Sequence, residues 1–161
     1  MEERYMTVNR ASMAAFLETM QDGEKFRLRV TGQSMMPLLF HGISTVTLIR
    51  QRIYKPCQGD VVLFFRPNGA FVLHRVHRIE ADGVLIVKGD AQNWTERISP
   101  HQVTAMVTSF CRRYREISVD GIGYRIYCVL WRPFRPLHPY GAKAVYLQHR
   151  LLQKIRGKKN F

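Results

Sequence analysis

A serine lies in a short turn-like segment near the start of the sequence, Thr31-Gly-Gln-Ser-Met-Met-Pro37. Ser34 comes just after a predicted strand, Gly32 precedes it by two positions, and Pro37 restricts the backbone behind it. Such a turn can expose a hydroxyl group and direct backbone N–H groups. A nucleophilic serine also needs a base within hydrogen-bond reach and donors for the oxyanion that forms. The base must therefore come from elsewhere in the chain.

Among the six histidines, His74 is the best candidate for this base. In the run Phe71–Ile79 it shares a strand face with Val72 and Val76, while His77 points to the opposite face. A single histidine on an apolar face is more often a core residue than a catalytic one. The role of His74 therefore depends on what lies across the next turn.

An aspartate follows that turn, in Lys88-Gly-Asp90. A three-residue loop over 81–83 would place His74 opposite Asp90 and put both side chains on one face. A two-residue loop over 82–83 would instead pair Arg75 with Asp90 and send the carboxylate to the other face. The sequence leaves both registers open.

Four short segments occur in a fixed order and together resemble the S24/S26 serine peptidases. This family includes type I signal peptidases and the self-cleaving phage and SOS-type repressors. The segments extend over Thr31 to Ile98, and it is their ordered set that is specific. They are Gly32-Gln-Ser-Met-Met-Pro37, Gly59-Asp-Val-Val-Leu-Phe64, Leu73-His-Arg-Val76 and Lys88-Gly-Asp90.

The resemblance implies a role for each matching residue. Ser34 matches the nucleophile, and His74 matches the general base of the endoplasmic-reticulum, archaeal and sporulation-type signal peptidases, where other members carry lysine. An imidazole with a pKa of about 6.5 can take up the serine proton at neutral pH. Asp90 matches the aspartate of the family's Gly-Asp pair and is preferred over Glu96 as the carboxylate that orients the ring. Asp60 matches a position that we interpret as a structural turn residue.

Three features differ from familiar members of this family. The sequence has no transmembrane anchor like that of the membrane-bound peptidases. Gly32 replaces a hydroxyl residue that signal peptidases often use in the oxyanion hole, so the Ser34 N–H is expected to be the main donor. The repressors carry a helix-turn-helix domain, whereas the residues before Thr31 predict a single helix. We therefore expect a stand-alone peptidase-like body.

Strand-like patterns dominate the elements that must position these residues. Alternation and hairpin signals predict strands over 26–31, 44–49, 61–65, 71–79, 84–87 and 103–115, and helical spacing predicts helices over 9–20, 124–131 and 142–155. The expected fold is mainly β, with a single signal-peptidase/repressor-like catalytic domain, a short N-terminal helix and a basic helical C-terminal extension. We place the boundaries at 1–25, 26–118 and 119–161.

Composition narrows the class of protein. The chain has 161 residues, 46% of them apolar, and no apolar run approaches the roughly 18 to 20 residues of a membrane-spanning helix. Residues 1–30 lack the features of a secretory signal, so a cytoplasmic location is expected. The three cysteines, Cys57, Cys111 and Cys128, have no CxxC spacing and are interpreted as reduced structural thiols. No metal or organic cofactor is expected.

The positive charge is concentrated near the C-terminus. Met1–Cys111 contains 13 basic and 10 acidic residues, whereas Arg112–Phe161 contains 12 basic and 2 acidic ones. This segment also interleaves aromatic and basic side chains. It is interpreted first as helices packed on the β body with a solvated basic face. Peripheral attachment to an anionic membrane, at the inner face, is the second interpretation, and nucleic-acid binding ranks below it.

We expect a serine endopeptidase that cleaves a leader- or signal-like peptide, with Ser34, His74 and Asp90 in the roles given above. The substrate would be an extended peptide with small residues near the cleavage site, lying along a strand edge. The alternative is a basic membrane- or nucleic-acid-binding protein on an inactive peptidase-like fold.

Overall fold

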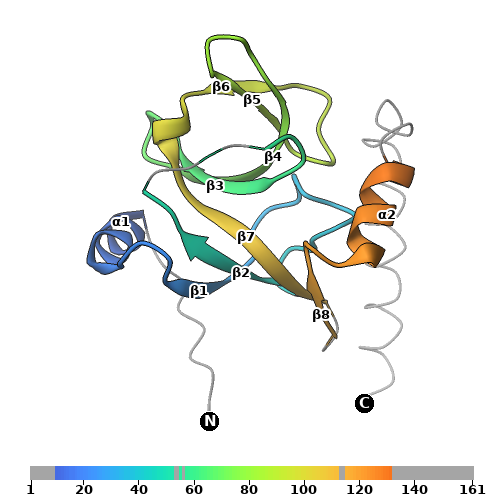
Figure 1. Cartoon of the computed structure of the whole chain (residues 1–161). Coiled ribbons are helices and arrows are strands. Elements are labelled where there is room, and N and C mark those ends of the chain that lie inside the picture. Colours follow the sequence, from blue (N-terminus) through green and yellow to red (C-terminus); the bar gives the residue numbers. More distant parts are fainter. Residues whose placement is uncertain (1–9, 53–54, 56, 113–114, 132–161) are drawn as a thin grey trace, which may run out of the picture.

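One antiparallel sheet organises the chain in the computed structural model, which describes residues 10–52, 55, 57–112 and 115–131 (Figure 1). The sheet has eight strands in these residues, in the order β1-β2-β7-β3-β4-β5-β6, with β8 paired to β7. β1 and β6 therefore form two of its edges. The strands are β1 (Lys25–Arg29), β2 (Thr45–Arg50), β3 (Val61–Phe65), β4 (Phe71–Ile79), β5 (Leu85–Lys88), β6 (Glu96–Ile98), β7 (Val103–Arg112) and β8 (Arg115–Ser118).

Strand β3 lies between two hydrophobic clusters. Its sequence is a continuous apolar run, and its first four residues are buried on both faces of the strand. Val61 and Leu63 belong to the larger cluster, whereas Val62 and Phe64 belong to a second cluster with residues of β4, β5, β6 and β7. An uninterrupted apolar run, rather than an alternating one, is what burial on both sides requires.

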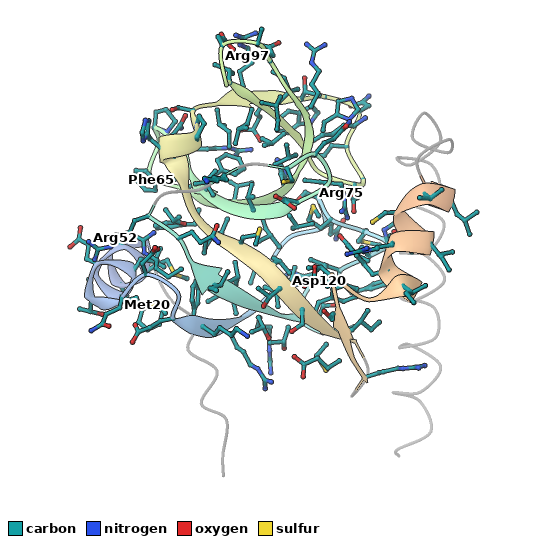
Figure 2. All side chains as sticks on the ribbon, in the orientation of Figure 1. Met20, Arg52, Phe65, Arg75, Arg97 and Asp120 are labelled. Atoms are coloured by element: carbon teal, nitrogen blue, oxygen red, sulfur yellow. The ribbon has the colours of Figure 1, made fainter. Side chains whose placement is uncertain are left out.

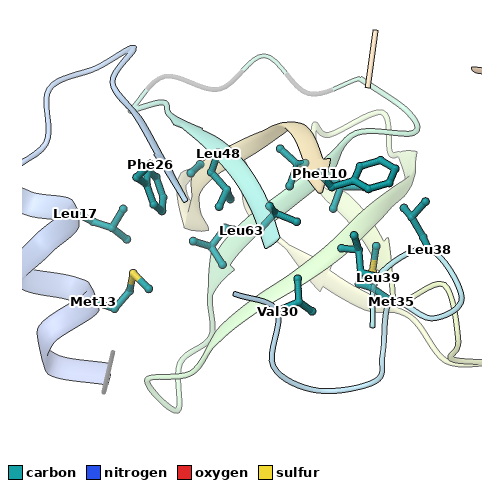
Figure 3. Close-up of a cluster of buried hydrophobic side chains, with 14 of the residues drawn as sticks. Met13, Leu17, Phe26, Val30, Met35, Leu38, Leu39, Leu48, Leu63 and Phe110 are labelled. Carbon is teal, nitrogen blue, oxygen red and sulfur yellow. The ribbon is translucent and has the colours of Figure 1, made fainter. Parts of the chain in front are cut away.

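The larger cluster fills the space between the sheet, the N-terminal helix and the segment around Ser34 (residues 31–37), which we call the serine turn (Figure 3). Helix α1 (Arg10–Thr19) contributes Met13 and Leu17, which are four residues apart and lie on one helical face. Met35 and Leu39, from the segment that follows Ser34, are also buried in this cluster. The turn is therefore held in place by its own apolar side chains.

The hairpin of β3 and β4 has the bounds that the sequence predicts. Its turn is closed by the Arg66 N–H, which donates to the Ala70 carbonyl over 2.9 Å, and Gly69 has a φ of 82°. Left-handed backbone of this kind favours glycine. Strand β4, however, is not regular: a bulge shifts its register against β5 between Val76 and Arg78.

A second helix, α2 (Ile122–Trp131), lies at the right of Figure 1, on the opposite side of the molecule from α1. Its Tyr124 is buried, and the ring centroid lies 5.8 Å from that of Phe110 in β7. The predicted helix over 124–131 is thus confirmed. The predicted helix over 142–155 lies outside the described residues.

The mainly β class is confirmed, but some elements differ from the prediction. The sequence does not predict β6 or the short 3-10 helix Pro100–Gln102. The single strand predicted over 103–115 is two strands, β7 and β8, which pair with each other. Short strands such as β6, with three residues, carry too little alternation to be recognised.

Candidate active site

Ser34 lies in the turn between β1 and β2 and is partly buried. The turn begins at Gly32, whose φ of 93° lies in the left-handed region and whose N–H donates to His41 Nδ1 over 2.9 Å. After Ser34 come Met35 and Met36, each only 2% exposed. The backbone is thus held before Ser34 by a hydrogen bond and after it by two buried side chains.

A second segment holds the same turn from across the site. The Ala91 N–H donates to the Ser34 carbonyl over 2.8 Å. A Cβ added at Gly89 would lie 2.7 Å from that carbonyl oxygen and 2.6 Å from Gln92 Oε1. Glycine is therefore required at position 89 by close packing against the serine turn, and the loop after β5 sets the position of Ser34.

His74 is almost completely buried on β4, with 1% of its surface exposed. It pairs with Val62 in the sheet register, and its ring lies 5.8 Å from Phe64 and 6.1 Å from Trp94 between centroids. Burial lowers the pKa of His74 to about 4, an effect that Glu96 partly opposes and Arg66 reinforces. The imidazole is therefore neutral at physiological pH.

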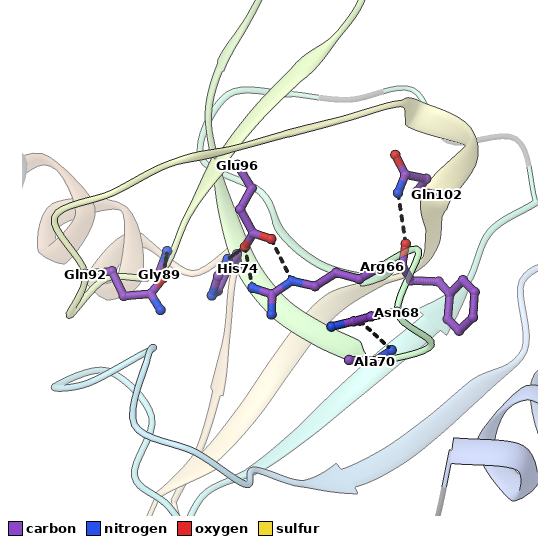
Figure 4. A network of polar contacts seen from close by, with 9 residues as sticks. Arg66, Asn68, Ala70, His74, Gly89, Gln92, Glu96 and Gln102 are labelled. Carbon is purple, nitrogen blue, oxygen red and sulfur yellow. Dashed lines mark hydrogen bonds and ion pairs between the residues drawn. The ribbon is translucent and has the colours of Figure 1, made fainter.

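A glutamate faces the ring of His74 (Figure 4). Glu96 Oε1 lies 3.0 Å from His74 Nδ1, although the contact lacks the alignment of a hydrogen bond and Nδ1 has no hydrogen-bond partner. The same carboxylate binds Arg66 through two hydrogen bonds, of 2.6 Å from Nε and 2.7 Å from a terminal nitrogen. Arg66 thereby fixes the carboxylate against the histidine, with the Trp94 ring 5.9 Å from its guanidinium carbon.

The structure gives Asp90 a different partner from the one expected. Its carboxylate accepts two hydrogen bonds from Arg75, of 2.8 Å from Nε and 2.7 Å from a terminal nitrogen, and both residues are buried. The carboxylate in contact with His74 is that of Glu96, the residue we ranked second. The expected contact between Asp90 and His74 is therefore corrected.

The β-bulge explains this exchange. The turn between β4 and β5 is the three-residue loop that would favour Asp90, since the Glu80 N–H donates to the Val84 carbonyl over 2.9 Å. The bulge at His77 then moves the register by one residue, and Arg75 pairs with Lys88. Because β4 carries an extra residue, its side chains before the bulge change faces relative to β5. Asp90 therefore lies on the same face as Arg75 and not on that of His74.

Arg75 extends this buried pair to helix α2. In Figure 2 it lies between the sheet and the helix. Its second terminal nitrogen donates to the Gly59 carbonyl over 2.9 Å and to the Tyr124 hydroxyl over 2.6 Å. Burial raises the pKa of Tyr124 to about 12, so its hydroxyl stays protonated. One arginine thus connects the loop that holds Ser34 to α2.

Ser34 and His74 line the same pocket, which has a volume of about 230 Å³. The other walls are formed by the residues between β1 and Ser34, by β4 and by Gln92. No hydrogen bond joins the serine and histidine side chains within the described residues. Catalytic hydrogen bonds are often long before substrate binds. The structure thus brings together Ser34 and His74 but not Asp90, and it adds Arg66 and Glu96.

Two of these site residues carry no signal in the sequence. Arg66 stands in a hairpin turn where a solvated charge would be expected, and Tyr124 lies in the predicted helical extension. Asp60, interpreted as a turn residue, does act in a turn, since its carboxylate accepts from the Cys57 N–H over 2.9 Å. In the described residues no cluster of three His, Cys, Asp or Glu side chains is placed to hold a metal ion.

Comparison with protein-family models identifies a family. A family model described as Peptidase S24-like matches residues 2–108. No curated protein matches the chain. The matched range includes Ser34, His74 and Glu96, and it ends before α2. In the part of the chain that the structure describes, no helix is both long and apolar enough to cross a bilayer.

Proposed function

Because the chain belongs to the Peptidase S24-like family, we propose that it is a serine endopeptidase with Ser34 as nucleophile and His74 as general base. The observation that carries this proposal is the shared pocket, in which a partly buried serine and a neutral, buried imidazole lie together. A base must be unprotonated to accept the serine proton, and burial keeps His74 in that form.

The proposed reaction proceeds through an acyl-enzyme. Ser34 Oγ forms a bond to the peptide carbonyl carbon while its proton passes to Nε2 of His74, because Nδ1 faces Glu96. The imidazolium then gives that proton to the departing amine as the C–N bond breaks. A water molecule repeats the sequence on the ester, which releases the acid and returns the proton to Ser34.

Glu96 takes the orienting role in this proposal. A carboxylate at Nδ1 stabilises the imidazolium that forms in the transition state and fixes which nitrogen carries the proton. Arg66 keeps the carboxylate in place through its two hydrogen bonds. The oxyanion would be bound by the backbone N–H of Ser34, which takes no part in the turn's own hydrogen bonds among the described residues.

We propose an extended peptide as the substrate, with small residues near the cleaved bond. The edge strand β1 leads directly into Val30, Thr31 and Gly32, which line the pocket. A peptide added along this edge would be guided towards Ser34. The pocket is small, at about 230 Å³, which suits short side chains next to the scissile bond.

The test compares the wild-type chain with Ser34→Ala and His74→Ala on a library of leader-like peptides, followed by mass spectrometry. Each variant should lose turnover by about 10³-fold or more, because each removes a group that makes or breaks bonds. His101→Ala, at an exposed position away from the pocket, is the matched control and should keep full activity. Cleavage by Ser34→Ala at the wild-type rate would contradict the proposal.

A further inference from the structure

Helix α2 presents an apolar face to solvent. The four most exposed large apolar side chains among the described residues all belong to this helix: Ile122 at 78%, Val129 at 65%, Leu130 at 62% and Ile126 at 52%. Elsewhere in these residues such side chains are exposed singly. Four together on one short helix form a patch that the folded body does not use.

The four side chains lie on one side of the helix, and the fold occupies the other. Their spacing confines them to an arc of about 100° around the helix axis. On the opposite side Tyr124 is buried in the larger hydrophobic cluster, with Tyr127 and Cys128 packed against it. Because Arg75 also binds the Tyr124 hydroxyl, α2 is fixed with its apolar face outward.

Charge indicates what this face meets. Residues 121–161 contain nine Lys or Arg and no Asp or Glu. Arg125, which is exposed, flanks the apolar arc. A second copy would bring the same positive charge against itself, and nucleic acid offers little to aliphatic side chains. An anionic bilayer supplies both an apolar layer and negative headgroups.

We propose that α2 docks the protein on an anionic membrane surface, with Ile122, Ile126, Val129 and Leu130 entering the headgroup boundary. Lys and Arg of residues 121–161 add attraction to lipid phosphates. This makes the expected membrane attachment more specific. The apolar contact is assigned to the exposed face of α2, and the attachment does not rest on basic charge alone. The proposal does not depend on peptidase activity.

The test is sedimentation of the full-length chain with vesicles of pure phosphatidylglycerol or pure phosphatidylcholine. The wild type should pellet with the anionic vesicles and remain largely in solution with the zwitterionic ones. The double substitution Val129→Ser with Leu130→Ser should weaken binding by about tenfold or more, because two inserted side chains become polar. Added salt should weaken the binding of both proteins.

A matched control separates this patch from general hydrophobicity. Ile79→Ser alters an aliphatic residue that is 40% exposed on β4 and should leave vesicle binding unchanged. Thermal unfolding of all variants should stay close to wild type, because the altered side chains are exposed. Equal vesicle binding by the double variant would overturn the proposal. So would binding to duplex DNA without vesicle binding, or a dimer that the double substitution disrupts without vesicle binding.

Discussion

At the residue scale, the contact between His74 and Glu96 joins a buried ring to a partly buried ion pair. The imidazole has a pKa lowered to about 4 by burial, and Glu96 is one of the groups that raise it. This value already includes the effect of Glu96, so without that negative charge the pKa would be lower and His74 a weaker base. The carboxylate that Arg66 holds 3.0 Å from Nδ1 supplies that charge.

Glu96→Gln should therefore slow peptide cleavage by about 10²-fold, because the imidazolium in the transition state loses its counter-charge. The same change should lower the pKa of His74 further. Since the base works only when unprotonated, wild-type kcat/KM should fall as pH drops through about 4, and the variant's acid limb should lie at lower pH. A pH profile of kcat/KM measures both effects.

Asp90→Asn provides the contrast for this experiment. It removes one partner of a buried ion pair and should lower the free energy of unfolding by about 3 to 5 kcal/mol. Its acid limb in kcat/KM should move less than that of Glu96→Gln, because Asp90 also raises the pKa of His74 but contributes less than Glu96 does. A shifted limb in Asp90→Asn together with an unshifted one in Glu96→Gln would return the orienting role to Asp90.

At the scale of the elements, the loop after β5 determines where the serine turn lies. Ala91 donates to the Ser34 carbonyl, and Gly89 packs directly against it. Ser34 is thus positioned by backbone contacts between two loops that are more than fifty residues apart in sequence. Small movements of either loop would displace Ser34, the proposed nucleophile.

Gly89→Ala should reduce peptide cleavage by about 10²-fold, because the added Cβ would lie 2.7 Å from a backbone oxygen and force the turn to move. Gly123→Ala is the matched control, since a Cβ there meets nothing within 4 Å and α2 gains a better helix former. The measurement is the cleavage rate at saturating peptide, with thermal unfolding in parallel. Full activity in Gly89→Ala would show that this contact does not position Ser34.

The elements differ in how far the sequence reveals them. The hairpin of β3 and β4 is predicted residue for residue, because an Asn-Gly turn between two β-rich runs is a strong local signal. The three-residue loop between β4 and β5 is one of the two alternatives that the sequence leaves open. The bulge at His77 is not predicted, because nothing in the residue types of Phe71–Ile79 marks an extra residue in the strand.

That bulge limits what could be predicted of the site. The sequence and the family resemblance select Ser34 and His74, which share the pocket. They rank Asp90 above Glu96, since motif position says nothing about a one-residue shift in register. Arg66 and Tyr124 reach the site through long side chains whose direction no spacing rule gives. Local patterns thus predict strands well and long-range partners poorly.

At the scale of the whole molecule, the buried histidine couples stability to pH. The pKa of His74 is about 4 in the folded protein and about 6.5 when unfolded, so the unfolded chain binds the proton more readily between these values. The contribution of His74 to stability is therefore complete above pH 6.5 and is lost as pH falls towards 4. Acid favours unfolding even before the carboxylates are protonated.

The contribution of His74 to the free energy of unfolding should fall by about 3 kcal/mol between pH 6.5 and 4. Urea unfolding at several pH values measures it, and the midpoint should fall steadily over this interval. His74→Ala removes the titrating group and should flatten the dependence. An equally steep dependence in that variant would assign the effect to other groups.

Strand β7 joins β2 to β3 and so connects the two halves of the pocket. Ser34 follows β1 on one half, whereas His74 lies on β4 in the other. The serine and the histidine thus lie on two separate hairpins, and Val103–Arg112, which pairs with a strand of each, follows both in the sequence. A fragment that ends before Val103 therefore lacks the strand that sets one hairpin against the other.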